Sequence, residues 1–303
     1  VYGKKYLNGK GESTVPELLE KTFFGIKIEW LIYIISLLSV FVFWQMVQSH
    51  EVVSSSLMVA GVLSAVYIIY YSITQVDKKA REQLFALTIL IVFTIIFWAL
   101  FEQAYTSLNL FADRVLDRGD IPAGSFLSLN ALFIILLAPV FAWLWVKLGK
   151  YNPNTAVKFS LALMLVGLGF GSLVLGINIS EMGKVGMIWL VITYFLHTCG
   201  ELCLSPVGLS AVTKLSPPKI VGFMMGVWFL ATASSEFIAS VLANIASVDT
   251  SNGTAPDLNI AKESYLVLFE YLFYTGLIFG VVLLIVSPFI KKLMHGVDKE
   301  LNR

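Results

Sequence analysis

The sequence predicts an all-α, polytopic membrane protein, and composition gives the first reason. Of the 303 residues, 57% are hydrophobic and 14% are charged, with a mean hydropathy of +0.81. Soluble domains carry roughly a quarter charged residues, so this chain departs far from soluble usage. The second reason is that long apolar windows recur along the chain, each near the ~20 residues that a helix needs to cross a bilayer core.

Eight such windows are present, and together they define the expected transmembrane spans. They run over Ile28–Val47, Leu57–Val76, Leu84–Leu116, Phe126–Leu148, Val157–Ile177, Val185–Leu215, Val221–Val248 and Tyr265–Ile290. Several are longer than a perpendicular crossing requires, which indicates tilt or extension beyond the bilayer. The connections carry turn-forming residues, and the longest is a polar run from Asp249 to Asp257. The first residues lack a short apolar core with a cleavage site, so we do not expect a signal peptide.

The distribution of positive charge predicts the orientation. With eight spans, all but four of the 21 Lys and Arg residues fall on one side; the exceptions are Arg114, Arg118, Lys184 and Lys262. Cytoplasmic loops carry the excess of Lys and Arg, so both termini are expected in the cytoplasm. The same bias supports the span count, because a missed span would exchange the sides of all later loops.

Two lone acids mark candidate functional positions. Glu102 lies in the third window, within FWALFEQAYTSLNLFAD at 97–113, and Glu201 lies in the sixth, within FLHTCGELCLSPVG at 195–208. Neither string contains Lys or Arg. An ionisable group at bilayer depth is costly and is rarely kept for packing alone, so each acid indicates a proton, ion or substrate site.

Helical spacing groups aromatic side chains around Glu102. One face of the third span is expected to present Trp98, Phe101, Glu102, Tyr105 and Asn109. Such a face could line a cavity. Burial raises the pKa of a carboxylate and a nearby cation lowers it, so a carboxylate on which these two effects balance can take up and release a proton. The alternative is a packed aromatic stripe whose acid is satisfied by Gln103 or by a neighbouring helix. We favour the cavity, because glutamate is a poor packing residue at this depth.

A second polar stripe follows the sixth span through His197, Glu201, Ser205 and Gly208. Pro206 lacks a backbone N–H, so the helix is expected to bend or open there. Freed carbonyl groups beside a carboxylate would suit a bound ammonium group, and an open helix at membrane depth is tolerated where it lines a watery cavity. For His197 we favour a hydrogen-bonded structural imidazole over a proton carrier.

Three weaker candidates lie in the fourth and seventh spans. The Asn130 amide suits either a substrate or a hydrogen bond between helices. Trp228 either lines a pocket or is simply a buried or lipid-facing side chain, and neither of these two interpretations is preferred. Glu236 shares a helical face with Trp228 but lies nearer the outer end of its span, so we rank it below Glu102 and Glu201.

Sequence motifs for several enzymatic and metal-binding functions are absent. The sequence has no phosphate-binding glycine loop, no His-Glu-x-x-His and no zinc-spaced Cys/His set, and it holds only three histidines. We therefore expect no enzyme activity, no metal, no cofactor and no nucleic-acid partner. The glycines from Gly167 to Gly171 lie inside an apolar span, where they indicate close helix packing. Cys199 and Cys203 are expected to be buried structural thiols.

Three blocks together resemble a known family. They are FWALFEQAYTSLNLFAD at 97–113, NALFI at 130–134 followed by APVFA at 138–142, and GELCLSPVGLS at 200–210. They are similar to the proton-coupled oligopeptide transporters (the POT or PTR family) of the major facilitator superfamily. The resemblance extends over essentially the whole chain but covers only the C-terminal half of that family's fold.

The resemblance implies a domain organisation. Spans three to eight would correspond to the family's helices seven to twelve, and the first two to an extra hairpin found in bacterial members. The expected parts are a cytoplasmic linker at 1–27, the hairpin at 28–82, a six-helix transporter bundle at 83–293 and a cytoplasmic tail at 294–303. We expect the N-terminal six-helix bundle, which alternating access requires as a partner, to lie outside the given sequence.

The resemblance also implies roles for individual residues. Proton coupling would involve Glu102 together with Glu201, and the peptide's amino end would be held by Asn130 and Glu201. Side-chain pockets would be lined by Trp98, Phe101, Ser205 and Trp228, with Gln103 as a further substrate-binding candidate. Asp113 would join an extracellular gate. Many members have a small residue where this chain has the bulky Tyr105, which leaves the shape of the pocket open.

The expected function is import of di- and tripeptides across the bacterial inner membrane, driven by proton influx and without covalent chemistry. The expected partners are peptides, protons and the lipid bilayer. One alternative is another substrate on the same scaffold, such as nitrate or a drug-like amine. A second is a proton-relay subunit of a larger membrane complex. The aromatics near Glu102 and the proline near Glu201 favour a pocket over a relay.

Overall fold

The computed structural model is predominantly helical and describes residues 17, 20–23, 25–180, 183–244 and 257–297. Within this described part, eight helical segments are long and apolar enough to cross a membrane. They extend over Ile28–Met46, Glu51–Thr74, Lys78–Arg114, Ala123–Tyr151, Thr155–Ile179, Met187–Leu215, Pro218–Ala243 and Leu258–Leu293. The predicted number and order of spans are confirmed. The polar run predicted from Asp249 lies outside the described residues, except for Asp257.

The chain divides into two compact units, Val1–Met58 and Val59–Arg303. The described part of the first unit contains a two-stranded antiparallel pair, β1 (Thr22–Phe23) and β2 (Ile26–Lys27), helix α3 (Ile28–Val47) and the start of α4 (His50–Thr74). Helix α3 carries apolar side chains on all faces, as expected for a membrane span. The domain boundaries proposed at 27/28, 82/83 and 293/294 stay predictions.

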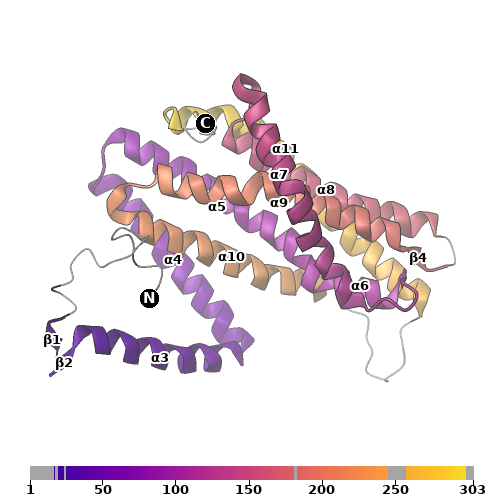
Figure 1. Cartoon of the computed structure of the whole chain (residues 1–303), viewed down its shortest axis with the longest axis horizontal. Coiled ribbons are helices and arrows are strands. Elements are labelled where there is room, and N and C mark those ends of the chain that lie inside the picture. Colours follow the sequence, from indigo (N-terminus) through magenta and orange to yellow (C-terminus); the bar gives the residue numbers. More distant parts are fainter. Residues whose placement is uncertain (1–16, 18–19, 24, 181–182, 245–256, 298–303) are drawn as a thin grey trace. The chain divides into compact units, whose positions relative to one another are not determined.

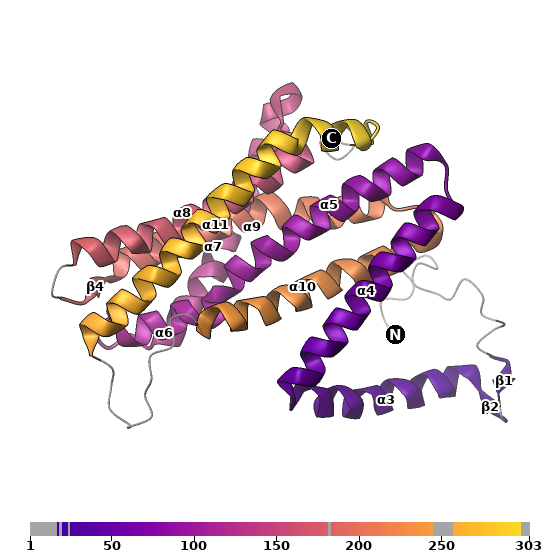
Figure 2. The ribbon, with the colours of Figure 1, turned by 180° about the vertical axis from the view of Figure 1, so that it is seen from behind.

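The second unit holds the rest of α4 and six further spans. Its elements are α5 (Lys78–Phe101), η1 (Glu102–Tyr105), α6 (Ser107–Arg114), β3 (Leu116–Asp117), η2 (Ala123–Leu127), α7 (Ser128–Leu148), η3 (Gly149–Tyr151), α8 (Thr155–Ile179), β4 (Val185–Gly186), α9 (Met187–Leu215), η4 (Pro218–Ile220), α10 (Val221–Ala243) and α11 (Leu258–Leu293). Helix α8 packs against both α9 and α11, while α5 packs against α10 and α11 (Figures 1 and 2). The short strands β3 and β4 pair in parallel.

Small residues allow α8 and α11 to approach closely. A Cβ atom added at Gly276 would lie 2.6 Å from the Cα of Gly167, so only glycine fits at this crossing. The same two helices are also joined by a hydrogen bond, which the Ser160 hydroxyl donates to the Gly280 carbonyl oxygen at 2.7 Å. This arrangement confirms the packing role predicted for Gly167, and it follows the usual preference for small residues between membrane helices.

Side-chain caps fix the first turns of three spans. The carboxylate of Asp77 accepts from the Ala80 N–H at 3.0 Å at the start of α5, and the Asn154 amide oxygen accepts from the Val157 N–H at 3.0 Å at the start of α8. Asp257 accepts from the Asn259 N–H at 2.9 Å before α11. These bonds satisfy backbone donors that have no partner within a helix.

The third span is interrupted at Glu102, so the single helical face predicted from Trp98 to Asn109 is wrong. Helix α5 ends at Phe101, a 3-10 turn occupies Glu102–Tyr105, and helix α6 starts at Ser107. A 3-10 turn has 3.0 residues per turn against 3.6 in an α-helix, so side chains after Phe101 rotate to a different side. Accordingly, Phe101 is buried while Tyr105 is 63% exposed.

The opening expected at Pro206 does not occur. Helix α9 continues from Met187 through Pro206 to Leu215. Because proline has no N–H, the Leu202 carbonyl still lacks its helical donor, although the helix around it persists. In a membrane span such a loss is tolerated when neighbouring groups or water satisfy the carbonyl.

Candidate functional site

Asn130 and Glu201 meet between α7 and α9. The Asn130 Nδ2 donates to Glu201 Oε2 at 2.9 Å and to Thr198 Oγ1 at 3.1 Å. Thr198 and Glu201 are one turn apart on α9, so both face the first turn of α7. The structure therefore brings together the two residues expected at a peptide's amino end, and it adds Thr198 as a second partner of Asn130.

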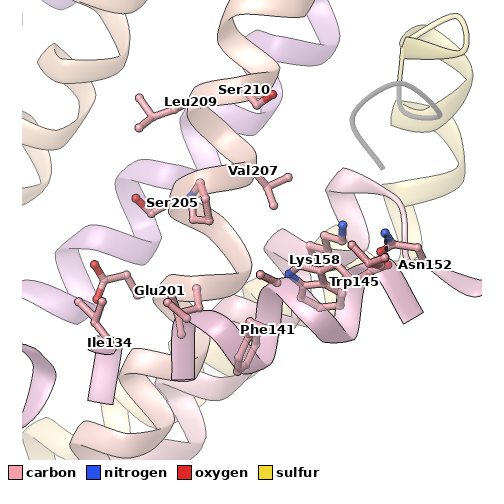
Figure 3. Close-up of a pocket in the computed structure, with 15 residues that line it drawn as sticks. Ile134, Phe141, Trp145, Asn152, Lys158, Glu201, Ser205, Val207, Leu209 and Ser210 are labelled. Atoms are coloured by element: carbon pink, nitrogen blue, oxygen red, sulfur yellow. Dashed lines mark hydrogen bonds between the residues drawn. The ribbon is translucent and has the colours of Figure 1, made fainter. Parts of the chain in front are cut away.

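Glu201 also lines a cavity of about 650 Å³, which we call the α7–α9 cavity. Ser205 and Pro206 line it from α9, and Ile134, Phe141 and Trp145 line it from α7. In Figure 3, Glu201 and Ser205 lie at one end of this lining and Trp145 and Lys158 at the other. Its walls are mainly apolar, with the carboxylate as a localised charge.

Lys158 brings a positive charge to the far end of the α7–α9 cavity. It is 2% exposed, and its ammonium nitrogen lies 4.5 Å from the centre of the Trp145 ring. A cation over an indole face is attracted by the ring's electron density. The cavity thus has a carboxylate and an ammonium group in its lining, on α9 and α8 respectively.

Glu102 lines a second cavity, the Glu102 cavity, of about 420 Å³. Tyr105, Thr106, Glu236 and Ala239 complete its lining, so two carboxylates face the same space. In the described part of the chain, no Lys, Arg or His forms an ion pair with Glu102, Glu201 or Glu236. A proton or another cation is therefore the chemistry that this acidic space can accommodate.

The aromatic residues near Glu102 form a packed cluster. The Trp98 ring meets Phe97 and Phe101 edge to face, with centroids 5.3 Å and 5.2 Å apart. Phe101 also lies 6.0 Å from the imidazole of His197. His197 is buried and hydrogen-bonded through Nε2 to the Val166 carbonyl oxygen at 3.2 Å, as predicted for a structural imidazole.

Gln103 forms its hydrogen bonds within the protein, and the substrate-binding role expected for it stays a prediction. Its side chain is fully buried, and its Nε2 donates to the carbonyl oxygens of Ala239 at 3.0 Å and Ala99 at 3.3 Å. Its Oε1 accepts from the hydroxyls of Ser107 at 2.7 Å and Thr106 at 3.4 Å. All of these partners belong to the protein, so Gln103 secures the interruption of the third span against α10.

Trp228 is buried, which agrees with one of the two interpretations left open for it, and its pocket-lining role stays a prediction. The indole is 4% exposed and packs on Gly208 of α9, where an added Cβ would lie within 2.2 Å of the ring. Trp228 therefore fills the contact between α10 and α9. Cys199 and Cys203 are buried free thiols on α9, as expected.

Asp113, the candidate gate residue, lies at the end of α6. Its carboxylate accepts from Arg118 at 2.8 Å, and the same guanidinium donates to the Ile121 carbonyl oxygen at 2.8 Å. The exposed pair ties α6 to the loop that follows it. The gating role of Asp113 stays a prediction.

Two site residues were missed or undervalued from the sequence. Thr198 lies three residues before Glu201, and that spacing alone could have placed it beside the carboxylate. Glu236 was ranked last of the three acids because of its depth, yet it faces the same cavity as Glu102. Nothing in the spacing along the chain connects these two acids, since they lie on different helices.

Comparison with known proteins identifies the family. Residues 10–260 match the POT family. A peptide transporter of Yersinia enterocolitica, YePEPT, is 37% identical over 212 residues, which span 66% of this chain and 42% of that protein. A di-/tripeptide transporter of Lactococcus lactis is 33% identical over 240 residues, spanning 76% of this chain and 46% of the relative. The chain belongs to the POT family.

Solved POT structures share its fold. A POT peptide transporter crystallised with sulfate aligns over 88% of this chain and 54% of that one, with a TM-score of 0.70 and 34% identity. A POT transporter in complex with 5-aminolevulinic acid aligns over the same shares, with a TM-score of 0.68 and 26% identity. The fold is that of the major facilitator superfamily, and the protein is a multi-pass membrane protein. This POT chain spans about half the length of the curated relatives that it matches.

Proposed function

We propose that this POT chain forms the C-terminal half of a proton-coupled symporter that imports di- and tripeptides by alternating access. The observation that carries the proposal is the pairing of Asn130 with Glu201 at the edge of the α7–α9 cavity. A lone carboxylate held by a neutral amide has no cationic partner of its own and stays available to a visiting cation, which a peptide's amino group supplies.

The amine would bind where several acceptors converge. Glu201 Oε2 already accepts from Asn130, which orients the carboxylate before the substrate arrives. Leu202 lines the same cavity, and its carbonyl, deprived of its helical donor by Pro206, is available as a neutral acceptor. An ammonium group has three donors, so a carboxylate with adjacent carbonyl groups matches its hydrogen-bonding capacity.

Proton coupling would rest on Glu102. Its carboxylate faces a cavity together with Glu236, and two acids in one space favour retention of at least one proton. In this scheme protons are the coupling ion and no cofactor or metal takes part. A second bundle would complete the pathway, because alternating access requires two bundles moving around a shared site.

The proposed location is the bacterial inner membrane, with both termini of this chain in the cytoplasm. The positive-inside asymmetry supports this orientation, since only Arg114, Arg118, Lys184 and Lys262 fall on the opposite side. In the structure, Arg114 ends α6 and Lys262 lies in the first turns of α11, both at the ends of spans.

Thermal stabilisation of the transporter by a dipeptide panel tests the substrate class. A ligand that binds only the folded protein raises its apparent stability in proportion to the logarithm of ligand concentration. Stabilisation by several unrelated dipeptides, and none by free amino acids or nitrate, supports peptide transport. Stabilisation by 5-aminolevulinic acid or nitrate alone would instead favour another substrate on this scaffold, and no response to any of them would favour a proton relay.

A further inference from the structure

A third, very small cavity lies where η1, α7 and α9 meet. Its volume is about 10 Å³, and its lining includes Ala104, Tyr105, Asn130, Tyr194 and His197. A space of roughly this size holds one water molecule when polar partners are present. We call it the His197 cavity, and it lies next to the Asn130 side chain that contacts Glu201.

His197 offers this cavity an acceptor. Its Nε2 is paired with the Val166 carbonyl oxygen, which can only accept, so Nε2 carries the hydrogen and Nδ1 of the neutral ring holds a lone pair. The Nδ1 atom is buried and has no hydrogen-bond partner within the described part of the chain. A buried polar atom without a partner is unfavourable, so a donor is expected there.

The packing of the ring shows where Nδ1 points. A Cβ added at Gly169 of α8 would lie 2.5 Å from His197 Cδ2 and 2.7 Å from Nε2, so that edge of the imidazole faces α8. Nδ1 is the ring atom opposite this edge. It therefore points away from α8, which contributes no residue to the lining of the His197 cavity.

Asn130 presents the complementary acceptor on another wall. Both hydrogens of its amide nitrogen are used, since Nδ2 donates to Thr198 and to Glu201. Among the described residues, no donor bonds its Oδ1. One water molecule has two O–H donors, and these match Nδ1 of His197 and Oδ1 of Asn130.

We propose that a single ordered water in the His197 cavity bridges His197 Nδ1 and Asn130 Oδ1. His197 then acts as a positioning residue that holds the Asn130 amide with its nitrogen towards Glu201. Without the bridge, the amide can turn over and place its oxygen against the carboxylate, which repels it. The proposal rests on the proposed function, in which Asn130 and Glu201 together receive a peptide's amino group.

Two substitutions, each placing a polar amide atom near one ring nitrogen, separate the roles of the two nitrogens. In His197→Asn, an amide oxygen takes the place of Nδ1, whereas in His197→Gln an amide nitrogen takes the place of Nε2. We expect dipeptide affinity to be kept in the asparagine variant and to fall roughly tenfold in the glutamine variant, as for a lost hydrogen bond to a charged site. In transport assays the loss should appear in KM, with kcat unchanged. Equal affinity of wild type and His197→Gln would overturn the proposal.

A second variant fills the cavity without altering the imidazole. Ala104→Val should displace the water and weaken dipeptide binding by a similar factor, because Ala104 lines the same space. The matched control is Thr193→Val on α9, which removes a fully buried hydroxyl bonded to Gly169 and Ser172 and alters no residue of this cavity's lining. Wild-type affinity in Ala104→Val, or an equal loss in the control, would contradict the bridge.

A high-resolution structure of the peptide-free transporter tests the water itself. Density between His197 Nδ1 and Asn130 Oδ1 supports the bridge, and a dry cavity overturns it whatever the substituted proteins do. This measurement does not depend on transport. If the wild type binds no dipeptide, the proposed function fails, while the water site is still decided by the density.

Discussion

At Glu201, one neutral amide, that of Asn130, orients a carboxylate at membrane depth. Asn130 donates to one carboxylate oxygen and, through its second hydrogen, to Thr198, so the amide is fixed on both sides. Hydrogen bonds to an ionised group are stronger than those between neutral groups. The carboxylate is thereby oriented without being neutralised, which suits a group that must receive a cation and release it.

Replacing Glu201 by glutamine should remove most dipeptide affinity. The substitution keeps the size of the side chain but removes the charge that an ammonium group requires, so we expect at least a roughly tenfold rise in Kd. Isothermal titration with a dipeptide measures the effect. Glu263→Gln, on the exposed side of α11, serves as the control. Normal affinity in Glu201→Gln would show that the amine is held elsewhere.

Glu102→Gln should uncouple transport from the proton gradient. The amide cannot take up or release a proton, so we expect loss of proton-driven accumulation while peptide exchange across the membrane continues in part. Uptake and counterflow in proteoliposomes distinguish the two activities. Glu236→Gln is the informative comparison, because it alters the other acid of the same cavity. Unchanged pH-dependent accumulation in Glu102→Gln would remove its coupling role.

At the level of elements, α8 and α11 owe their close contact to glycine. The backbone of Gly167 occupies the space that a side chain on Gly276 would need. Membrane helices gain little from burying apolar surface against each other, so close packing and hydrogen bonds such as Ser160 to Gly280 stabilise their association. The contact is therefore sensitive to any added atom.

Gly276→Leu should destabilise the bundle. The new side chain meets backbone atoms at 2.6 Å and must push α8 and α11 apart, a cost of about 1–3 kcal/mol or more for overpacking. Thermal unfolding in detergent checks this expectation. Gly226→Ala in α10 is the matched control, because no atom lies within 4 Å of its added Cβ. That variant should be neutral or slightly more stable, since alanine favours a helix over glycine.

The sequence predicted the spans better than their interruptions. Hydrophobic windows located all eight helical segments because the bilayer sets their length and composition. The break at Glu102 was not predicted, since it depends on Gln103 reaching the Ala239 carbonyl on α10, far away in the chain. At Pro206 the sequence predicted an opening that does not occur, because the surrounding bundle holds α9 helical despite the missing donor.

For the candidate site too, the sequence predicted which residues take part better than which contacts they make. Asn130 and Glu201 could be named from residue type and family resemblance, but their direct hydrogen bond depends on how α7 crosses α9. Glu236 joins Glu102 only through the packing of α10 beside η1. Residue type alone does not distinguish a pocket-lining from a packing role for Trp228 and Gln103, and only the structure shows that both side chains are buried.

For the whole molecule, charge asymmetry predicts one orientation, and labelling can test it. In a protein with Cys199 and Cys203 replaced by serine, Asp120→Cys should react with a membrane-impermeant maleimide added to intact cells. Lys150→Cys should react only after the membrane is opened. Both positions are exposed, Asp120 just before the fourth span and Lys150 in the η3 turn at its other end. The reverse labelling pattern would contradict cytoplasmic termini.

The interruption after Phe101 has a mechanical consequence for the intact transporter. The third span consists of two helices, α5 and α6, joined by one 3-10 turn, and Asp113 in α6 pairs with Arg118 in the loop that follows. Reorienting α6 relative to α5 would change the torsions of this turn and break the Gln103 bond to the Ala239 carbonyl, without unravelling either helix. Glu102 is the first residue of the turn, so the acid proposed to take up the proton lies where the span can bend.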